Sequence, residues 1–167
     1  MTLNQHWGYY TGDGNWKSSQ EVVRRFVDIA SKGGSFLLNV GPTGEGIIPA
    51  GSVARLAEVG AWLTTNGGAI YGTTASPLGK PAWGRCTKKV TAEGTTLYLH
   101  IFDWPADGKL LVPKLENSVE SATLLATGQA LVATASDRGI SIALPPAAPD
   151  AISSTIVLQV RGARSLR

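Results

Sequence analysis

The sequence has one cysteine and no apolar run long enough to cross a membrane. Cys86 is the single cysteine among 167 residues, which excludes an internal disulfide and a metal site built from several cysteines. A membrane-spanning helix needs about 18 consecutive apolar residues, and no segment approaches this length. The opening residues, MTLNQHWGYY, lack the basic and apolar stretches of a signal peptide. We therefore expect a soluble chain with no membrane partner, in an unknown compartment.

Charged residues are also scarce, at 16% of the chain, and the 15 Lys and Arg exceed the 12 Asp and Glu only slightly. The excess is matched by Arg161, Arg164 and Arg167 at the C-terminus, which we interpret as a frayed basic tail. Recognition of nucleic acid needs basic residues clustered along one face. The sequence therefore predicts no nucleic-acid partner.

The chain is too short for a complete (β/α)₈ barrel, which needs about 250 residues. At 17.5 kDa, with 43% hydrophobic residues, it can still bury one core or two small ones. It contains 20 glycines and 9 prolines, which indicate many turns. No internal repeat is visible.

The first part of the chain alternates between helical and strand patterns. Ser18 and Glu21 have the spacing of a capping box, and the apolar spacing that follows predicts a helix over 18–32. The apolar run at 35–40 predicts a strand covered on both faces, as in a parallel sheet. A second helix is expected over 50–65. Its apolar side is predicted to comprise Val53, Leu56, Val59, Gly60 and Leu63.

From about residue 71 the pattern changes to the period of two that strands show, most clearly at 95–102. Short strands at such spacing predict an antiparallel sandwich. The expected organisation is an α/β fragment over residues 1–70 and an all-β sandwich over 71–167, with the boundary inside 67–81. Further strands are expected at 109–112, 121–126, 130–134, 140–144 and 155–160.

Two carboxylates, Asp13 and Glu45, lie in loops that could share one end of the α/β part. A retaining glycosidase pair needs carboxyl groups about 5–5.5 Å apart. Both residues stand among glycines and small polar residues. These surroundings favour a solvated turn over a desolvated catalytic pocket.

The remaining polar motifs predict no cofactor. The glycine-rich loop at 41–46 lacks the Gly-Lys-Ser/Thr of a phosphate loop, so we interpret it as a turn. His6 and His100 have no companions at the spacing of metal ligands. His100 stands inside an alternating strand, where we expect its side chain to be partly exposed.

An aromatic cluster near the N-terminus is more informative. Sugars present apolar C–H faces that pack on indole and phenol rings, while their hydroxyls bond to polar neighbours. The same rings could instead cover the end of a barrel, and composition alone favours that covering role. The cluster comprises His6, Trp7, Tyr9, Tyr10 and Trp16.

Three ordered segments carry a family resemblance: MTLNQHWGYYTGDGNWKSS, FLLNVGPTGEGIIP and VGAWLTTNGGAIYGT. Together they resemble the C-terminal third of the catalytic domain in α-L-fucosidases of glycoside hydrolase family 29. Residues 71–167, which include LHIFDWPADGKLLVP, are similar to the β-sandwich that follows that domain. The resemblance covers nearly the whole chain. It implies the last units of a (β/α)₈-like barrel followed by an antiparallel sandwich.

The activity implied by the resemblance is hydrolysis of terminal α-linked L-fucose with retention, through a covalent glycosyl-enzyme intermediate. The family's aspartate nucleophile and its usual glutamate acid/base lie upstream of the matched segments. The resemblance therefore implies a truncated form without a catalytic residue, weak or inactive as a monomer. Activity would need self-association through exposed barrel surfaces or a substitute site, and the sequence leaves open whether the chain is itself an enzyme.

For substrate binding, the resemblance implies that Trp7 closes one side of the fucose pocket, with His6 and Tyr9 beside it. Asn39 would be a structural hydrogen-bond partner near the pocket floor. The implied ligands are a fucosylated glycan or a small fucoside.

An alternative interpretation is a non-catalytic module, a β-sandwich that binds carbohydrate or a protein partner. Trp83 and Trp104 would then be the aromatic contacts. Trp104 precedes a proline and could equally fasten a hairpin.

Overall fold

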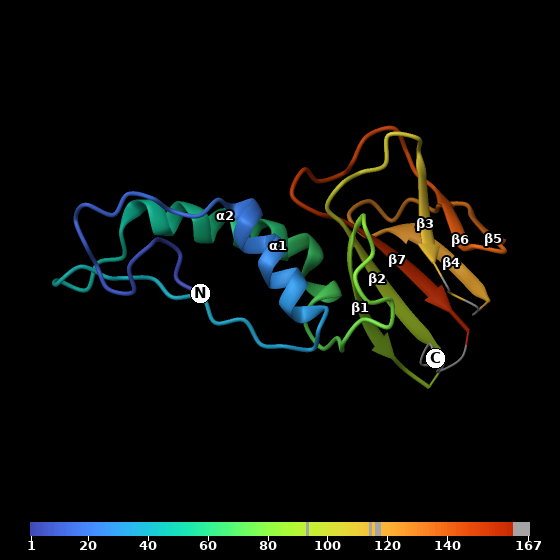
Figure 1. The fold of residues 1–167 in the computed structure, drawn as a ribbon, viewed down its shortest axis with the longest axis horizontal. Helices are drawn as coiled ribbons and strands as arrows, with labels where there is room; N and C mark the ends of the chain where they lie inside the picture. The colour runs from blue at the N-terminus through green and yellow to red at the C-terminus, as the bar shows by residue number, and fades with distance from the viewer. Residues whose placement is uncertain (93, 114, 116–117, 162–167) are drawn as a thin grey trace.

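The computed structural model describes residues 1–92, 94–113, 115 and 118–161. Helices lie in the first part of this described chain and strands in the second (Figure 1). None of its helices is both long enough and apolar enough to span a bilayer. The elements in chain order are α1 (Ser19–Ala30), α2 (Ala50–Asn66), the 3-10 turn η1 (Gly67–Ala69), β1 (Gly84–Val90), β2 (Thr95–Ile101), β3 (Lys109–Pro113), β4 (Val119–Leu124), β5 (Ala133–Ser136), β6 (Gly139–Ala143) and β7 (Ser154–Val160).

The predicted first helix is present, and its start follows from the capping residue. Ser18 has extended backbone angles, and its hydroxyl accepts a hydrogen bond from the Glu21 N–H at 3.1 Å. After the helix, Gly33 adopts a left-handed φ of 76°, which lets the chain reverse at low steric cost. The helix buries one face, formed by Val22, Val23 and Val27.

The second helix has the expected bounds, but its predicted apolar side is partly wrong. Val53, Leu56 and Gly60 are exposed. The physical reason is that α1 packs against one side of α2, and within the described residues nothing covers the side that bears Val53 and Leu56. The buried residues of α2 are Ser52, Val59, Trp62 and Asn66.

The strand predicted at 35–40 is wrong for this structure. Only an isolated parallel bridge forms, between Thr2 and Asn39. Leu3 N–H donates to the Asn39 carbonyl and Asn39 N–H to the Met1 carbonyl, both at 2.9 Å. A buried strand needs hydrogen-bonded neighbours along both edges. Among the described residues only 1–3 run beside this segment, and Leu37 is 73% exposed.

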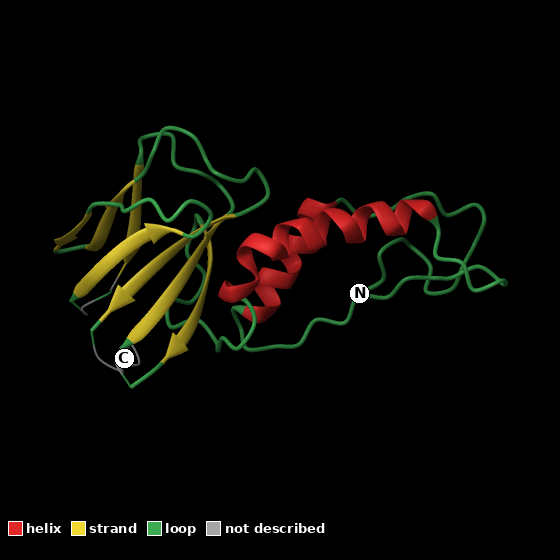
Figure 2. Cartoon of the chain, turned by 180° about the vertical axis from the view of Figure 1, so that it is seen from behind, coloured by secondary structure: helices red, strands yellow, loops and turns green. Residues whose placement is uncertain are grey.

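Antiparallel pairing throughout the second part confirms the predicted all-β class. One sheet has the order β1-β2-β7-β4 and the other β3-β6-β5. Figure 2 shows the strands grouped at one end of the molecule, with the helices beside them. Strand β5 begins at Ala133, later than expected. Strand β1 was not predicted from the sequence, because GRCTKKV carries charges and no clean alternation, as is common at a sheet edge. The two sheets enclose one core, which includes Leu97, Leu99, Leu110, Ile142, Ile156 and Leu158.

A second buried cluster lies between the helices and the N-terminal segment, and polar contacts join it to the sandwich. Arg24 on α1 donates from Nε to the Ile152 carbonyl at 3.0 Å and from Nη2 to the Phe102 carbonyl at 2.5 Å. Its guanidinium also lies 5.0 Å from the centre of the Phe102 ring. Arg85 on β1 pairs with Asp28 on α1. Arg24 reaches backbone carbonyls between strands and Asp28 pairs with a strand residue, so these contacts hold α1 at a defined place on the sandwich.

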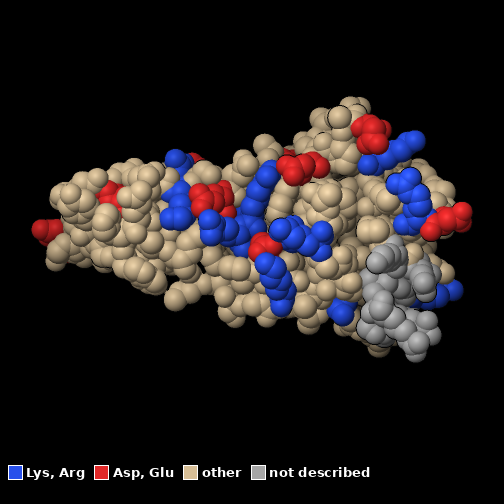
Figure 3. All heavy atoms as spheres, viewed as in Figure 1, with Lys and Arg blue, Asp and Glu red and all other residues tan. Residues whose placement is uncertain are grey.

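Charged side chains gather over this junction and over the sheets on the face drawn in Figure 3, with few at the end formed by the loops around residues 4–17 and 41–49. Arg161 is exposed and pairs with Glu120 at 3.0 Å. The other two arginines of the expected basic tail, Arg164 and Arg167, lie outside the described residues.

His100 is fully buried, so the expected partial exposure is wrong. Its Nε2 lies 3.1 Å from the Thr87 hydroxyl and its Nδ1 3.4 Å from the Thr155 hydroxyl. Thr155 in turn donates to the Asn66 side chain at the end of α2, at 2.8 Å. The Trp62 ring of α2 lies 6.5 Å from the imidazole. The alternation in β2 places His100 on the face of the sheet that points away from the sandwich core. Helix α2 packs on that face and buries the imidazole.

We predict that His100 makes stability depend on pH in a defined window. Burial lowers the pKa of His100 from 6.5 to about 4, so the unfolded chain binds a proton that the folded chain excludes. The contribution of neutral His100 to the free energy of unfolding is fully present above pH 6.5 and declines as the pH falls toward 4. Urea unfolding of the native protein should show a loss of about 2 to 3 kcal/mol between pH 7 and pH 4.5.

The control is His100→Gln, which keeps a polar side chain but cannot titrate. All other groups contribute equally to both proteins, so the difference between the two pH profiles isolates His100. Parallel profiles for native and variant protein would show that folding leaves the pKa of His100 unchanged and would contradict this prediction.

Candidate functional site

The predicted sugar-binding aromatics lie in one loop that is closed at its base. Lys17 N–H donates to the Leu3 carbonyl at 2.9 Å, and Lys17 Nζ donates to the Asn4 carbonyl at 2.8 Å. Leu3 itself is fully buried in the helical core. The loop of residues 4–17 therefore has a fixed base, while its tip faces solvent.

Asp13 organises this loop from the inside. Its side chain is only 1% exposed, and its Oδ2 accepts hydrogen bonds from Gln5 N–H at 3.0 Å, His6 N–H at 2.9 Å and His6 Nδ1 at 2.8 Å. The hydrogen bond from the His6 side chain is the largest cause that lowers the pKa of Asp13. The expected solvated turn is wrong for Asp13, because donors seven and eight residues away converge on it across the loop.

Four members of the aromatic cluster stand at the surface and one does not. Trp7 is 62% exposed, and Tyr9 and Tyr10 are exposed beside it in the chain. The His6 and Tyr10 rings meet edge-on with centroids 5.1 Å apart. Trp16 instead donates from Nε1 to the Ser52 hydroxyl at 2.9 Å, which fastens the loop to α2.

A second segment supports the loop from behind. Asn39 donates from Nδ2 to the Trp7 carbonyl at 2.8 Å and to the Thr2 hydroxyl at 3.1 Å. A Cβ at Gly41 would lie 2.7 Å from the Gly8 carbonyl carbon and 2.8 Å from the Tyr9 nitrogen. The two backbones are therefore in direct contact, which the sequence does not reveal, because the glycine-rich pattern at 41–46 indicates only a turn.

Glu45 lies in an exposed turn closed by Thr43 and Ile47. A hydrogen bond from Thr43 lowers the pKa of Glu45. Within the described chain no hydrogen bond or ion pair joins Glu45 to Asp13, whose carboxylate is engaged by its own loop. The structure therefore does not present these two acids as a facing pair.

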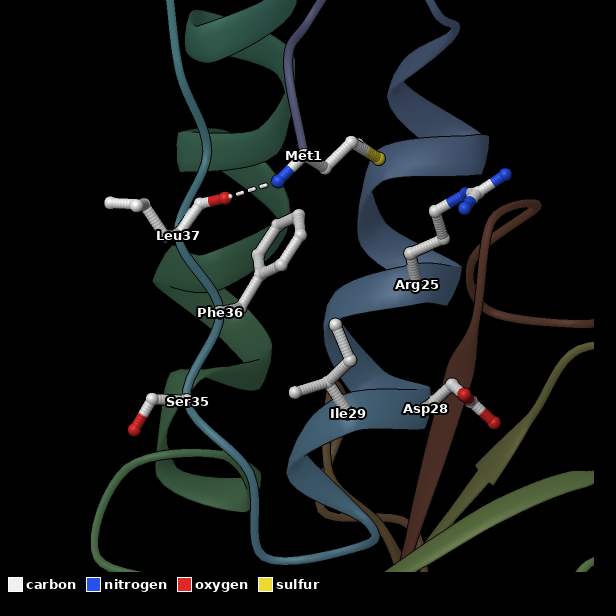
Figure 4. Close-up of a pocket in the computed structure, with 7 residues that line it drawn as sticks. All are labelled: Met1, Arg25, Asp28, Ile29, Ser35, Phe36 and Leu37. Atoms are coloured by element: carbon white, nitrogen blue, oxygen red, sulfur yellow. Dashed lines mark hydrogen bonds between the residues drawn. The ribbon is translucent and has the colours of Figure 1, made fainter.

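A pocket of about 370 Å³ lies elsewhere, between α1 and the segment around residues 35–37 (Figure 4). The N-terminal amino group donates to the Leu37 carbonyl at 2.8 Å along one wall. None of the predicted sugar-binding residues lines it. Its lining consists of Met1, Arg25, Asp28, Ile29, Ser35, Phe36 and Leu37.

The two tryptophans of the alternative interpretation are committed to the sandwich. Trp83 donates from Nε1 to the Leu111 carbonyl at 2.9 Å, and Trp104 to the Pro145 carbonyl at 3.0 Å. Both rings are half-buried against the sandwich core. In the part of the chain that the structure describes, no cluster of His, Cys, Asp and Glu could hold a metal ion.

Comparison with known proteins points to one family. Residues 1–68 match the family model described as alpha-L-fucosidase. The tissue alpha-L-fucosidase of Homo sapiens is 34% identical over 145 residues, which cover 84% of this chain and 30% of that protein. The chain spans about a third of the length of the curated relatives that it matches.

Solved structures agree with this match. Alpha-L-fucosidase isoenzyme 1 from Paenibacillus thiaminolyticus superposes with a TM-score of 0.87 at 38% identity, over 97% of this chain and 39% of that one. The Thermotoga maritima alpha-fucosidase, solved in complex with fucose, superposes with a TM-score of 0.82 at 29% identity, over 95% of this chain and 38% of that one.

We predict that Gly41→Ala displaces the aromatic loop. The added methyl group would overlap the backbone of Gly8 and Tyr9, and such overpacking costs about 1–3 kcal/mol. Hydrogen exchange should show faster exchange of the His6 and Asp13 amides, which are hydrogen-bonded within this loop, in this variant. Gly44→Ala is the matched control, because no atom lies within 4 Å of the position its methyl group would take. Equal exchange in both variants would contradict the close contact.

Proposed function

The chain belongs to the α-L-fucosidase family of glycoside hydrolases, whose C-terminal portion it matches, and we propose that its loop of residues 6–10 binds an α-L-fucoside. The exposed indole of Trp7 carries this proposal. An indole packs well on the apolar face of a pyranose ring, and hydroxyl and imidazole groups bond to its polar edge. His6 and Tyr9 flank Trp7 and supply those groups. Asn39 holds the Trp7 backbone from behind.

We further propose that residues 1–70 are the last units of a (β/α)₈-like catalytic barrel and that residues 71–167 form the sandwich domain. The family match ends at residue 68, before the first strand at Gly84. The parallel bridge between Thr2 and Asn39 has the orientation that barrel strands share, with α1 as the helix between them. These observations support the division of the chain.

Retaining hydrolysis of a fucoside needs two carboxylic acids on opposite sides of the glycosidic bond. Asp13 is engaged by its own loop, and Glu45 stands alone in an exposed turn. On this proposal the chain contributes a substrate-binding surface. Hydrolysis by the monomer is then weak or absent, because neither acid is placed as a partner of the other.

We propose that a second copy of the chain covers the apolar surface around Leu37. Leu37, Val53 and Leu56 are exposed aliphatic side chains on the barrel-like part, and contact with water makes such surfaces unfavourable. The pocket beside Leu37 could receive an apolar side chain from the partner. A twofold dimer would use the same patch on both copies.

Trp7→Ala should weaken binding of an aryl α-L-fucoside about tenfold or more, since stacking and burial of the ring contribute on the order of 1.5 kcal/mol. Isothermal titration calorimetry measures this without relying on tryptophan fluorescence. Tyr71→Ala, which removes an equally exposed aromatic ring outside the loop, is the control and should bind normally. Unchanged affinity in Trp7→Ala would exclude this loop as the site and favour the sandwich module instead.

Leu37→Lys should shift the protein toward monomer, because the charge would be buried in the proposed interface. Sedimentation velocity over a concentration series measures the change. Val132→Lys places the same charge on a comparably exposed aliphatic position of the sandwich and should leave self-association intact. A native chain that stays monomeric at every concentration, or equal behaviour of both variants, would rule out the proposed interface.

A further inference from the structure

The contact between His6 and Asp13 determines where the imidazole carries its hydrogen. His6 Nδ1 lies 2.8 Å from Asp13 Oδ2, which also accepts from two backbone N–H groups. An ionised carboxylate can only accept hydrogen bonds. The lowered pKa of Asp13 keeps it ionised at neutral pH, so the shared hydrogen belongs to Nδ1 of His6.

The other ring nitrogen is then left as an acceptor. A neutral imidazole has one N–H, and with that hydrogen on Nδ1, Nε2 presents its lone pair. Among the described residues no hydrogen bond to Nε2 of His6 is found, and the side chain is 55% exposed. Tyr10 packs edge-on against the ring, and Gly12 leaves room for it, since a Cβ there would lie 2.8 Å from the phenol ring.

We infer that Asp13 is a positioning residue that presents His6 Nε2 as the hydrogen-bond acceptor for a hydroxyl of the sugar stacked on Trp7. The sugar part of this inference rests on the proposed function, whereas the position of the hydrogen does not. His6 and Trp7 are adjacent, and each is also held at its backbone, His6 by Asp13 at 2.9 Å and Trp7 by Asn39 at 2.8 Å. One residue thus takes the apolar face of the ligand and its neighbour takes a hydroxyl.

The position of the hydrogen can be read directly by long-range ¹H–¹⁵N NMR of the imidazole rings. The chain has only two histidines, and His6→Gln assigns their signals. In its neutral form the native His6 ring should carry its hydrogen on Nδ1. A His6 ring with its hydrogen on Nε2 would overturn the inference whether or not a sugar binds.

Two substitutions at Asp13 separate positioning from general loss of structure. Asp13→Asn should keep the hydrogen on Nδ1, because the N–H groups of Gln5 and His6 still hold an oxygen at the Oδ2 position. Asp13→Ala removes the acceptor, and the ring should become a mixture of both forms. Identical His6 spectra in the native protein and in Asp13→Ala would contradict a positioning role.

Binding of methyl α-L-fucoside tests the ligand part. His6→Ala and Asp13→Ala should each weaken binding about fivefold, the usual effect of one hydrogen bond. The double variant should bind no more weakly than His6→Ala alone, because Asp13 acts through His6. Additive losses would show that Asp13 acts only on the structure of the loop.

Addition of methyl α-L-fucoside should also shift the Nε2 signal of the native His6 ring. If the indole signal of Trp7 responds and the His6 signal does not, the ligand role of His6 is overturned while the proposed function stands. If neither signal responds, the ligand role and the proposed function both fail. In each case the position of the hydrogen on His6 is decided independently by the spectrum of the free protein.

Discussion

The pairing of the first three residues with residues 37–39 is the contact on which the candidate site depends. Met1 and Leu3 exchange backbone hydrogen bonds with Leu37 and Asn39 at 2.8–2.9 Å. This places Leu3 in the helical core, and the Leu3 carbonyl then closes the aromatic loop by accepting from Lys17. Without that pairing, Asn39 and Gly41 would not lie behind Trp7. A few backbone bonds therefore organise two loops that are distant in sequence.

The remainder of the molecule keeps this assembly in place through its junction with the sandwich. Arg24 and Trp62 donate to backbone carbonyls between strands, and His100 joins the end of α2 to the sheet through the hydroxyl of Thr155. These groups are buried or half-buried, and the hydrogen bonds of Arg24, Trp62 and Thr155 cross the junction between the helices and the sandwich. Buried polar contacts of this kind fix the orientation of the helices on the sandwich, because any other orientation would leave a buried polar group without a hydrogen bond. The sandwich thus acts as a base for the helices that carry the loop.

Local signals in the sequence were reliable where one element decided the outcome. Ser18 begins α1 as its spacing to Glu21 predicts, and alternation in β2 identifies the strand. The segment 35–40 has the apolar side chains of a buried strand, yet a strand buried on both faces also needs hydrogen-bonded neighbours along both edges. Leu37 illustrates the consequence, because its apolar side chain is exposed to solvent. Periodicity reports the preference of a segment and says nothing about which neighbours are present.

The sequence by itself determined the family, the all-β class of the second part, and the candidate sugar-binding residues at the N-terminus. Tertiary structure decided the role of each polar group. Asp13 stands among glycines, and only the folded loop brings His6 onto its carboxylate. His100 alternates like an exposed residue, and only the packing of α2 buries it. The physical reason is that burial and hydrogen-bond partners depend on contacts between distant segments, whereas sequence patterns record the local geometry of one segment at a time.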